Sequence, residues 1–148
     1  MRILVSACLL GLRVRYDGKS KPCEAVIRLM KKHELIPVCA EVFGGLPTPR
    51  VPAERVGDRV IAKDGRDVTA EYVRGAEEIA RLAQMYHCTH AILKEKSPSC
   101  GKGRIYDGTH TGTLTAGNGV LAELLMEMGV EVIGETEIDR LADGSPAE

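Results

Sequence analysis

Four short apolar runs, rich in β-branched residues, recur along the chain and predict four strands. Their sequences are RILVSA, ELIPVCAEV, THAILKE and VEVIGE, at residues 2–7, 34–42, 89–95 and 130–135. Between them, apolar residues recur with a helical period, which predicts helices over residues 22–33, 67–87 and 115–129. Strands that alternate with helices are typical of a mostly parallel sheet with helices on both faces.

Particular residues predict where two of these helices begin and which side of the first helix is buried. Pro22 suits a first helical turn, and Thr69 suits an N-cap position. We expect the first helix to bury Val26, Leu29 and Met30.

The segment FGGLPTPRVPAERVGDRVIAKDGRD, residues 43–67, interrupts the alternation of strands and helices. Three prolines exclude a regular element over residues 46–53, whereas RVIAKDGRD predicts a short hairpin arm that ends in an Asp-Gly turn. A loop this long is usually functional or mobile. We therefore predict a three-layer α/β fold with a sheet of about four strands in the Rossmann-like or flavodoxin-like order 2-1-3-4, plus a small hairpin insertion. Residues 1–148 are expected to form a single domain.

Composition and charge narrow the classes of partner. The chain has 148 residues, of which 44 % are hydrophobic and 28 % charged, and its formal net charge is -1. This balance argues against non-specific nucleic-acid binding, and one Phe with four Tyr and no Trp offers no base-stacking platform. No apolar run is long enough to span a bilayer, and the apolar N-terminus resembles a first strand rather than a signal peptide. We therefore expect a cytoplasmic protein with no membrane partner.

Five cysteines are present: Cys8, Cys23, Cys39, Cys88 and Cys100. The odd number and the absence of a secretory signal disfavour a disulfide framework. No two cysteines have the CxxC spacing of zinc knuckles and thioredoxins. Any joint function of these thiols therefore depends on their meeting in space.

Three of the thiols follow the predicted strands. Cys8, Cys39 and Cys100 come at or just past the ends of the first three strands. In open α/β sheets the ligand crevice lies at the carboxyl ends of the strands, and neighbouring strands are roughly 4.8 Å apart. The three thiols could therefore converge on an object the size of a metal site or an iron–sulfur cluster. The alternative is that they are small buried hydrophobes, as free cysteines often are, and we favour that interpretation for Cys23 and Cys88.

The ordered motifs of the chain resemble the thiouracil desulfurase family. They are LVSACLLG, RYDG, VCAEVFGGLPTPR, GRDVT, AILKEKSPSCG and IYDG, and together they cover nearly the whole chain. The resemblance implies a 4Fe–4S cluster held by Cys8, Cys39 and Cys100, with one iron free of protein ligands. It also implies functional roles for Glu41 and Ser97.

Such a site suits the removal of sulfur from a thiolated pyrimidine, such as 2- or 4-thiouracil or its nucleotide. An open iron in a thiolate environment is a soft Lewis acid that matches a thiocarbonyl sulfur. Water would add to the ring carbon, sulfide would leave on the open iron, and no net electron transfer would occur. Glu41 is the candidate acid–base group, and Ser97 is the candidate for orienting substrate.

Two other hypotheses stay open at this point. One is a sulfurtransferase that carries a persulfide on Cys23 or Cys100 and needs no iron. The other is a non-catalytic module that binds a metal or a cluster through its three cysteines. His110 could shuttle protons, although we expect it to lie at the surface. The sequence does not specify the oligomeric state or the acceptor of the sulfide.

Overall fold

The four predicted strands form one parallel sheet. The computed structural model describes the backbone of residues 1–144 and the side chains of residues 1–141. The strands are β1 (Arg2–Ser6), β2 (Glu34–Val38), β5 (His90–Leu93) and β8 (Glu131–Gly134), and they lie in the order β2-β1-β5-β8. All three pairings are parallel. Counted along the chain, these strands have the order 2-1-3-4, so the predicted topology is confirmed.

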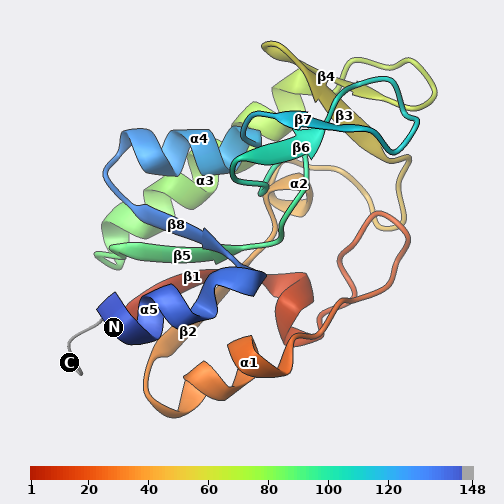
Figure 1. Cartoon of the computed structure of the whole chain (residues 1–148). Helices are drawn as coiled ribbons and strands as arrows, with labels where there is room; N and C mark the ends of the chain where they lie inside the picture. The colour runs from red at the N-terminus through yellow and green to blue at the C-terminus, as the bar shows by residue number, and fades with distance from the viewer. Residues whose placement is uncertain (145–148) are drawn as a thin grey trace.

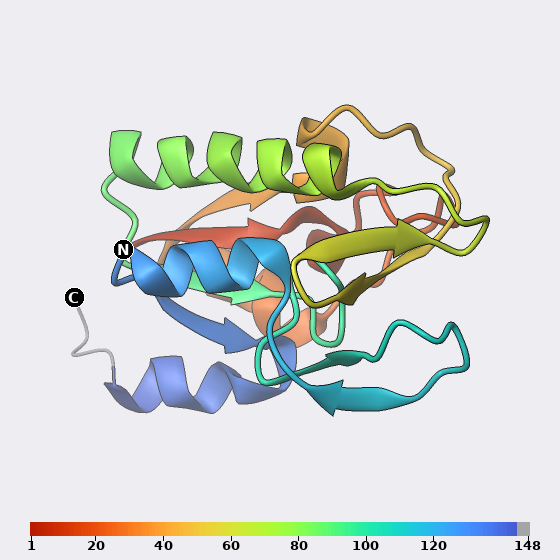
Figure 2. The ribbon, with the colours of Figure 1, turned by 90° about the horizontal axis from the view of Figure 1, so that it is seen from above.

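Helices cover both faces of this sheet (Figures 1 and 2). One face carries α3 (Thr69–Met85) and α4 (Val120–Glu127), and the other carries α1 (Glu24–Ile27) and α5 (Ile138–Gly144). The three-layer arrangement is therefore confirmed. Within residues 1–144, none of the helices combines the length and apolar character needed to cross a membrane.

Each strand contributes to two hydrophobic cores, because successive residues of a strand point to opposite faces. The core under α3 and α4 includes Leu4, Ala91, Leu93, Ile79 and Leu125. The core under α1 and α5 includes Ile3, Val5, Ile92, Val26 and Leu141. Burial on both faces explains why the strand sequences are continuous apolar runs.

The first predicted helix is shorter and more irregular than expected. After Ile27 the chain tightens into the 3-10 helix η2 (Arg28–Lys31). Pro22 lies before the N-cap residue Cys23, outside the first turn. Met30 is 58 % exposed, so its predicted burial is wrong, because the tighter turn rotates it out of the apolar face.

The prediction for the start of α3 is also wrong by one position. Thr69 is the first helical residue, and the N-cap position belongs to Val68. The carboxylate of Asp67 accepts a hydrogen bond from the Thr69 N–H at 2.9 Å. The Thr69 hydroxyl accepts one from the Val60 N–H at 2.8 Å, which ties the helix to the neighbouring hairpin. Hydrogen bonds from Thr69, with a further one from Arg59, lower the pKa of Asp67 to about 2.

Two antiparallel hairpins lie on the side toward which β5 and β8 point (Figure 1). The first, β3 (Ala53–Val56) with β4 (Arg59–Ala62), confirms the predicted hairpin insertion. The second, β6 (Arg104–Tyr106) with β7 (Leu114–Ala116), was not predicted. Because β7 takes up the residues before Gly117, the helix expected from residue 115 begins only at Val120.

The remaining short elements follow the strand ends. They are η1 (Ala7–Leu10) after β1, α2 (Ala40–Phe43) after β2, and η3 (Glu135–Glu137) after β8. The helix α2 packs closely on α3 through glycines on both sides. A Cβ at Gly75 would overlap the carbonyl group of Ala40, and a Cβ at Gly44 would overlap the carbonyl group of Glu71. This close approach fixes the position of α2 at the carboxyl edge of the sheet.

We expect Gly75→Ala to destabilise the protein strongly, because the new methyl group must push α2 away from α3. Overpacking of this kind costs about 3 kcal/mol of unfolding free energy. For a domain of this size, that is a fall of about 6–12 °C in melting temperature. Thermal unfolding followed by circular dichroism measures the change. The control is Gln84→Ala on the exposed side of α3, expected to stay within about 2 °C of the wild type. A wild-type melting temperature for Gly75→Ala would contradict the close packing.

Candidate functional site

The carboxyl edge of the sheet borders a cavity of about 580 Å³. Cys8 lies in η1 directly after β1, Cys39 is the N-cap residue of α2 directly after β2, and Cys100 lies in the loop after β5. All three line this cavity, together with Glu41 and Ser97. The five residues selected from the sequence therefore lie around one space.

The other two cysteines lie elsewhere. Cys88 is 6 % exposed and packs in the core under α3 and α4. Cys23 packs against the opposite core, and neither residue lines the cavity. This arrangement agrees with the structural role favoured for both. All five thiols are free in the structure.

Burial, with a smaller contribution from nearby negative groups, raises the pKa of the three cavity thiols and keeps them protonated in the protein alone. Burial, followed by the nearby Cys39, raises the pKa of Cys8 to about 11, against the opposing charges of Lys94 and Arg15. Burial likewise raises the pKa of Cys39, while the backbone N–H of Val42 works against the rise. The Cys39 thiol also lies 4.0 Å from the Val14 carbonyl oxygen.

Cys100 is the most enclosed of the three thiols. Its sulfur accepts a hydrogen bond from the Ser6 hydroxyl at 3.3 Å and lies 3.6 Å from the Ser99 hydroxyl oxygen. These contacts lower its pKa, but burial prevails and raises it to about 12, with further contributions from Cys39 and Cys8. Each of the three thiols therefore lies close enough to another that ionisation of one disfavours ionisation of its neighbour. A group that brings positive charge into the cavity would relieve this repulsion.

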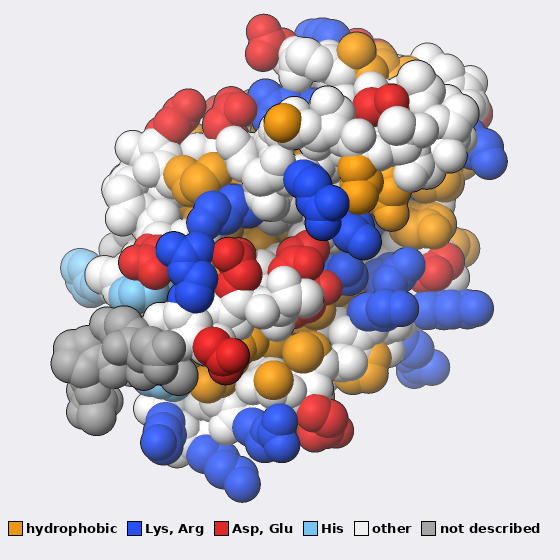
Figure 3. Space-filling view, in the orientation of Figure 1, with side chains coloured by type: hydrophobic (Ala, Val, Ile, Leu, Met, Phe, Trp, Pro, Cys, Tyr) orange, Lys and Arg blue, Asp and Glu red, His pale blue; other side chains and the backbone are white. Residues whose placement is uncertain are grey.

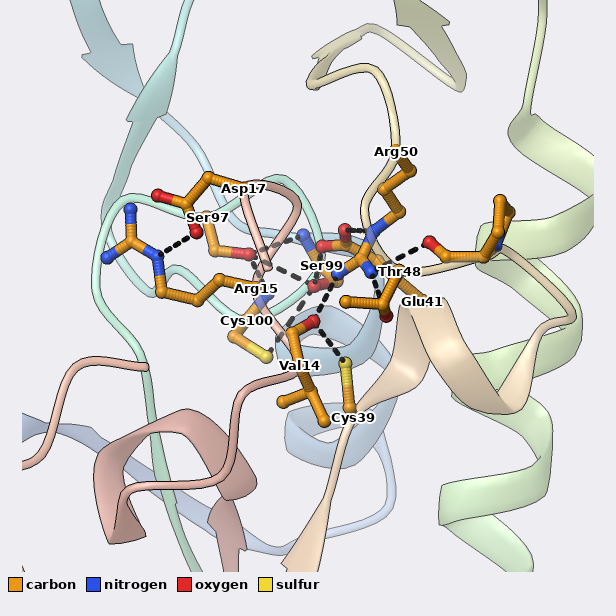
Figure 4. A network of polar contacts seen from close by, with 11 residues as sticks. Val14, Arg15, Asp17, Cys39, Glu41, Thr48, Arg50, Ser97, Ser99 and Cys100 are labelled. Atoms are coloured by element: carbon orange, nitrogen blue, oxygen red, sulfur yellow. Dashed lines mark hydrogen bonds and ion pairs between the residues drawn. The ribbon is translucent and has the colours of Figure 1, made fainter. Parts of the chain in front are cut away.

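A network of polar side chains adjoins the sulfur atoms (Figure 4). Glu41 is its centre: one carboxylate oxygen accepts from Arg50 Nε at 2.8 Å, and the other accepts from the Ser99 hydroxyl at 3.0 Å. Burial, and then the adjacent carboxylate of Glu41, raise the pKa of Tyr72. Ser99 is 3 % exposed, so this contact is shielded from solvent.

The two serines have different roles in this network. Ser97 Oγ lies 3.0 Å from Ser99 Oγ and accepts hydrogen bonds from the backbone N–H groups of Ser99 and Cys100. Ser97 therefore reaches Glu41 only through Ser99. The sequence analysis favoured Ser97, and only side-chain packing reveals that Ser99 is the serine that contacts the carboxylate.

Arg50 holds the network together and was missed in the sequence analysis. Its guanidinium donates to the carbonyl oxygens of Val14 at 2.8 Å and Pro47 at 3.2 Å, and to the Thr48 hydroxyl at 3.1 Å. Its side chain is 5 % exposed, and that of Glu41 is 13 % exposed. The residue thus fastens the chain around Val14, one wall of the cavity, to the carboxylate. Its position in a proline-rich loop, after Pro49 and before Pro52, gave no signal of this role.

We expect Arg50→Gln to lower the unfolding free energy by about 3 kcal/mol, because it leaves the enclosed Glu41 carboxylate without its cation. Urea unfolding measures this loss. Arg2→Gln is the matched control: Arg2 pairs with Glu34 at 2.8 Å, but both side chains are about half exposed or more. Breaking that surface pair should change stability by less than about 1 kcal/mol. If the two substitutions lower the unfolding free energy equally, enclosure of the Arg50–Glu41 pair does not add to its contribution to stability.

The three thiols fit a cluster better than a single ion. In the described part of the chain, no three His, Cys, Asp or Glu side chains are grouped closely enough to hold one metal ion. The thiols nevertheless share one cavity and influence one another's pKa. A polynuclear iron–sulfur cluster, which takes a separate thiolate on each iron, needs its ligands around a common space rather than around a point.

Positive charge is also gathered around the cavity. Its lining includes Arg15, Lys21, Lys63, Lys94 and Lys96. Figure 3 shows Lys and Arg side chains clustered on the same side of the molecule, over the loop that follows η1. Lys94 is held by Glu135 at 2.8 Å. Cations in these positions favour thiolates and anionic ligands.

The fold and the site together define an α/β protein with a thiol-lined cavity at the carboxyl edge of its sheet. The family model for 2-thiouracil desulfurase matches residues 3–137, and the chain belongs to this enzyme family.

Two similar proteins extend the comparison. The chain is 39 % identical over 147 residues to the uncharacterized protein YbbK of Bacillus subtilis (strain 168), with 93 % of this chain and 97 % of YbbK covered. It is 47 % identical to a solved structure, the 4Fe–4S-dependent thiouracil desulfidase TudS, with a TM-score of 0.92. That match covers 97 % of this chain and 96 % of the TudS chain.

Proposed function

We propose that this protein is an iron–sulfur-dependent desulfurase of thiolated pyrimidines. Its substrate would be 2- or 4-thiouracil or the corresponding nucleotide. The reaction exchanges sulfur for oxygen: the C=S group and water give C=O and hydrogen sulfide, so no electrons are gained or lost. The observation that carries this proposal is the convergence of three thiols and a hydrogen-bonded carboxylate on one cavity. Family membership and the likeness to TudS support it.

In this proposal Cys8, Cys39 and Cys100 would hold a 4Fe–4S cluster. When bound, the cluster supplies a soft Lewis acid for the thiocarbonyl sulfur, and its positive iron relieves the repulsion among the thiols. The chain contributes the remaining functions. It encloses the substrate, excludes bulk water and positions the groups that move protons.

Glu41 is proposed to accept the proton of the attacking water. Arg50 fixes one oxygen of its carboxylate, so the oxygen that faces Ser99 is the one available for proton transfer. Such general base catalysis is typically worth about 10²–10⁴-fold in rate. The neighbouring phenol of Tyr72 is buried and stays protonated, so it does not compete as a base.

Ser97 and Ser99 form a short path between Glu41 and the cavity. If Ser99 donates to Glu41, its oxygen can accept from the Ser97 hydroxyl at 3.0 Å. A proton can then move between the carboxylate and a group beside Ser97. We propose that these hydrogen bonds reverse once Glu41 has taken up a proton: Glu41 then donates to Ser99 and Ser99 to Ser97, so the Ser97 hydroxyl is free to donate to, and to orient, the pyrimidine.

We further propose that residues 1–148 act as one domain and that the enzyme is cytoplasmic. The cavity takes residues from Ser6 through Gly112, so it is assembled from most of the chain. Five free thiols are typical of a reducing compartment.

The proposal is tested by reconstituting the protein with iron and sulfide without oxygen, then adding 2- or 4-thiouracil. We expect sulfide and the oxo-pyrimidine to form in equal amounts, and only in the iron-loaded protein. Turnover by iron-free protein would favour the persulfide sulfurtransferase instead. A loaded protein that releases no sulfide from either base or from 4-thiouridine monophosphate would favour a non-catalytic cluster module.

A further inference from the structure

The cavity extends beyond the thiols to the two hairpins. This part of its wall is formed by Glu54 on β3, Lys63 after β4, and Tyr106, His110 and Gly112 around the loop between β6 and β7. Small-molecule cavities commonly measure about 300–1,000 Å³, and a pyrimidine ring alone is at the small end of what they hold. The hairpin wall therefore has room to contact the substrate away from its thiocarbonyl group.

Glu54 fastens the loop between β6 and β7 to this wall. One of its carboxylate oxygens accepts hydrogen bonds from the backbone N–H groups of Gly108 at 2.9 Å and His110 at 3.0 Å. The other oxygen lies 3.6 Å from His110 Nδ1. Side-chain exposure is 12 % for Glu54 and 18 % for His110, so the expected surface position of His110 is wrong. The docking of the second hairpin encloses it.

His110 has an unfavourable backbone conformation and an unpaired buried ring nitrogen. Its φ of 58° lies in the left-handed region, which residues other than glycine seldom adopt. Its Nε2 atom is buried and has no hydrogen-bond partner, a condition that no other side-chain nitrogen or oxygen shares in the described part of the chain. Both features reduce stability, and strained residues with unpaired polar atoms concentrate at binding sites.

The position of Glu54 determines what His110 can bind. A carboxylate 3.6 Å from Nδ1 favours a proton on that nitrogen. In the imidazole tautomer that carries its one proton there, Nε2 has a lone pair and acts as a hydrogen-bond acceptor. Its partner must therefore be an N–H or O–H group.

We propose that His110 is a specificity-determining substrate contact, in which Nε2 accepts a hydrogen bond from an N–H or O–H group of the pyrimidine substrate and Glu54 positions the ring. This proposal rests on the proposed function. The donor has two possible sources: a ring N–H of the free base or a hydroxyl of an attached pentose.

The test compares His110→Phe, which removes the acceptor, with His110→Gln, which can restore one near the position of Nε2. Binding of uracil and uridine to the reconstituted protein is measured by calorimetry, and kcat and KM are measured with 4-thiouracil and 4-thiouridine. We expect His110→Phe to weaken binding and raise KM by about tenfold, one hydrogen bond's worth. It should leave kcat within about threefold, and His110→Gln should recover most of the loss. If His110→Phe weakens the binding of uracil, the donor is a ring N–H of the base. If it weakens the binding of uridine alone, the donor is a hydroxyl of the pentose.

His87→Phe is the matched control, because His87 also has a left-handed backbone, with φ of 55°, but is exposed and does not line the cavity. It should bind and turn over like the wild type. Any of three results overturns the proposal. The His110→Phe variant binds both ligands normally, the His110→Phe and His110→Gln variants bind them equally weakly, or the wild type binds neither ligand. The sulfide released by the wild type separately tests the proposed function, so failure of one can be told from failure of the other.

Discussion

Glu41→Gln should lower sulfide release from thiouracil by about 10²–10⁴-fold while the iron content stays at the wild-type level. A glutamine side chain can still accept a hydrogen bond from Arg50 through its oxygen and can place its amide near Ser99, but it cannot take a proton from water. Arg50 also keeps its bonds to Val14, Pro47 and Thr48, so the loop around it stays fastened. Sulfide release is measured per bound iron, which separates chemistry from cluster loss.

The matched control for this substitution is Glu123→Gln. Glu123 also pairs with an arginine, Arg55 at 3.2 Å, but it does not line the cavity. It should release sulfide at the wild-type rate. Normal turnover by Glu41→Gln would exclude Glu41 as the base, and a loss of iron together with activity would assign it a structural role at the thiols.

Serine in place of Cys8, Cys39 or Cys100 should each reduce the iron bound after reconstitution to about a tenth of the wild-type amount. An alcohol is a harder ligand than a thiolate, and it does not ionise in a buried setting. The fold should survive, because serine is nearly the same size as cysteine and, like the protonated thiol, is uncharged in the apoprotein. Iron and acid-labile sulfide analysis measures the loss, and circular dichroism checks the fold.

Cys88→Ser supplies the control for a buried cysteine that is remote from the cavity. It should retain wild-type iron even if its melting temperature falls by a few degrees. If all four variants lose iron equally, the loss reflects the fold rather than ligation. If any variant among Cys8, Cys39 and Cys100 keeps full iron and activity, the proposed ligand set is wrong.

The sheet was predictable from the sequence because its strands are buried on both faces. Runs such as Ile3–Val5 and Ala91–Leu93 are apolar throughout, and the helices between them force parallel pairing. Parallel pairing then brings the strand ends to one edge. The convergence of Cys8, Cys39 and Cys100 therefore followed from topology, before any side chain was placed.

The hairpin regions were harder to predict because their structure depends on contacts between distant segments. The strands β6 and β7 have three residues each and show no clear alternation. Arg50 became a candidate only when the loop after α2 folded against Val14. His110 is buried by Glu54, which lies 56 residues earlier in the chain. Sequence spacing carries no information about such contacts.

The position of iron in the protein tests the central claim most directly. Crystals of the anaerobically reconstituted chain can be measured with X-rays at the iron absorption edge. We expect about four iron peaks, as in a cubane cluster, inside the cavity and bounded by the sulfurs of Cys8, Cys39 and Cys100. Iron bound at another place, or a lone zinc between these sulfurs in an active enzyme, would contradict the account.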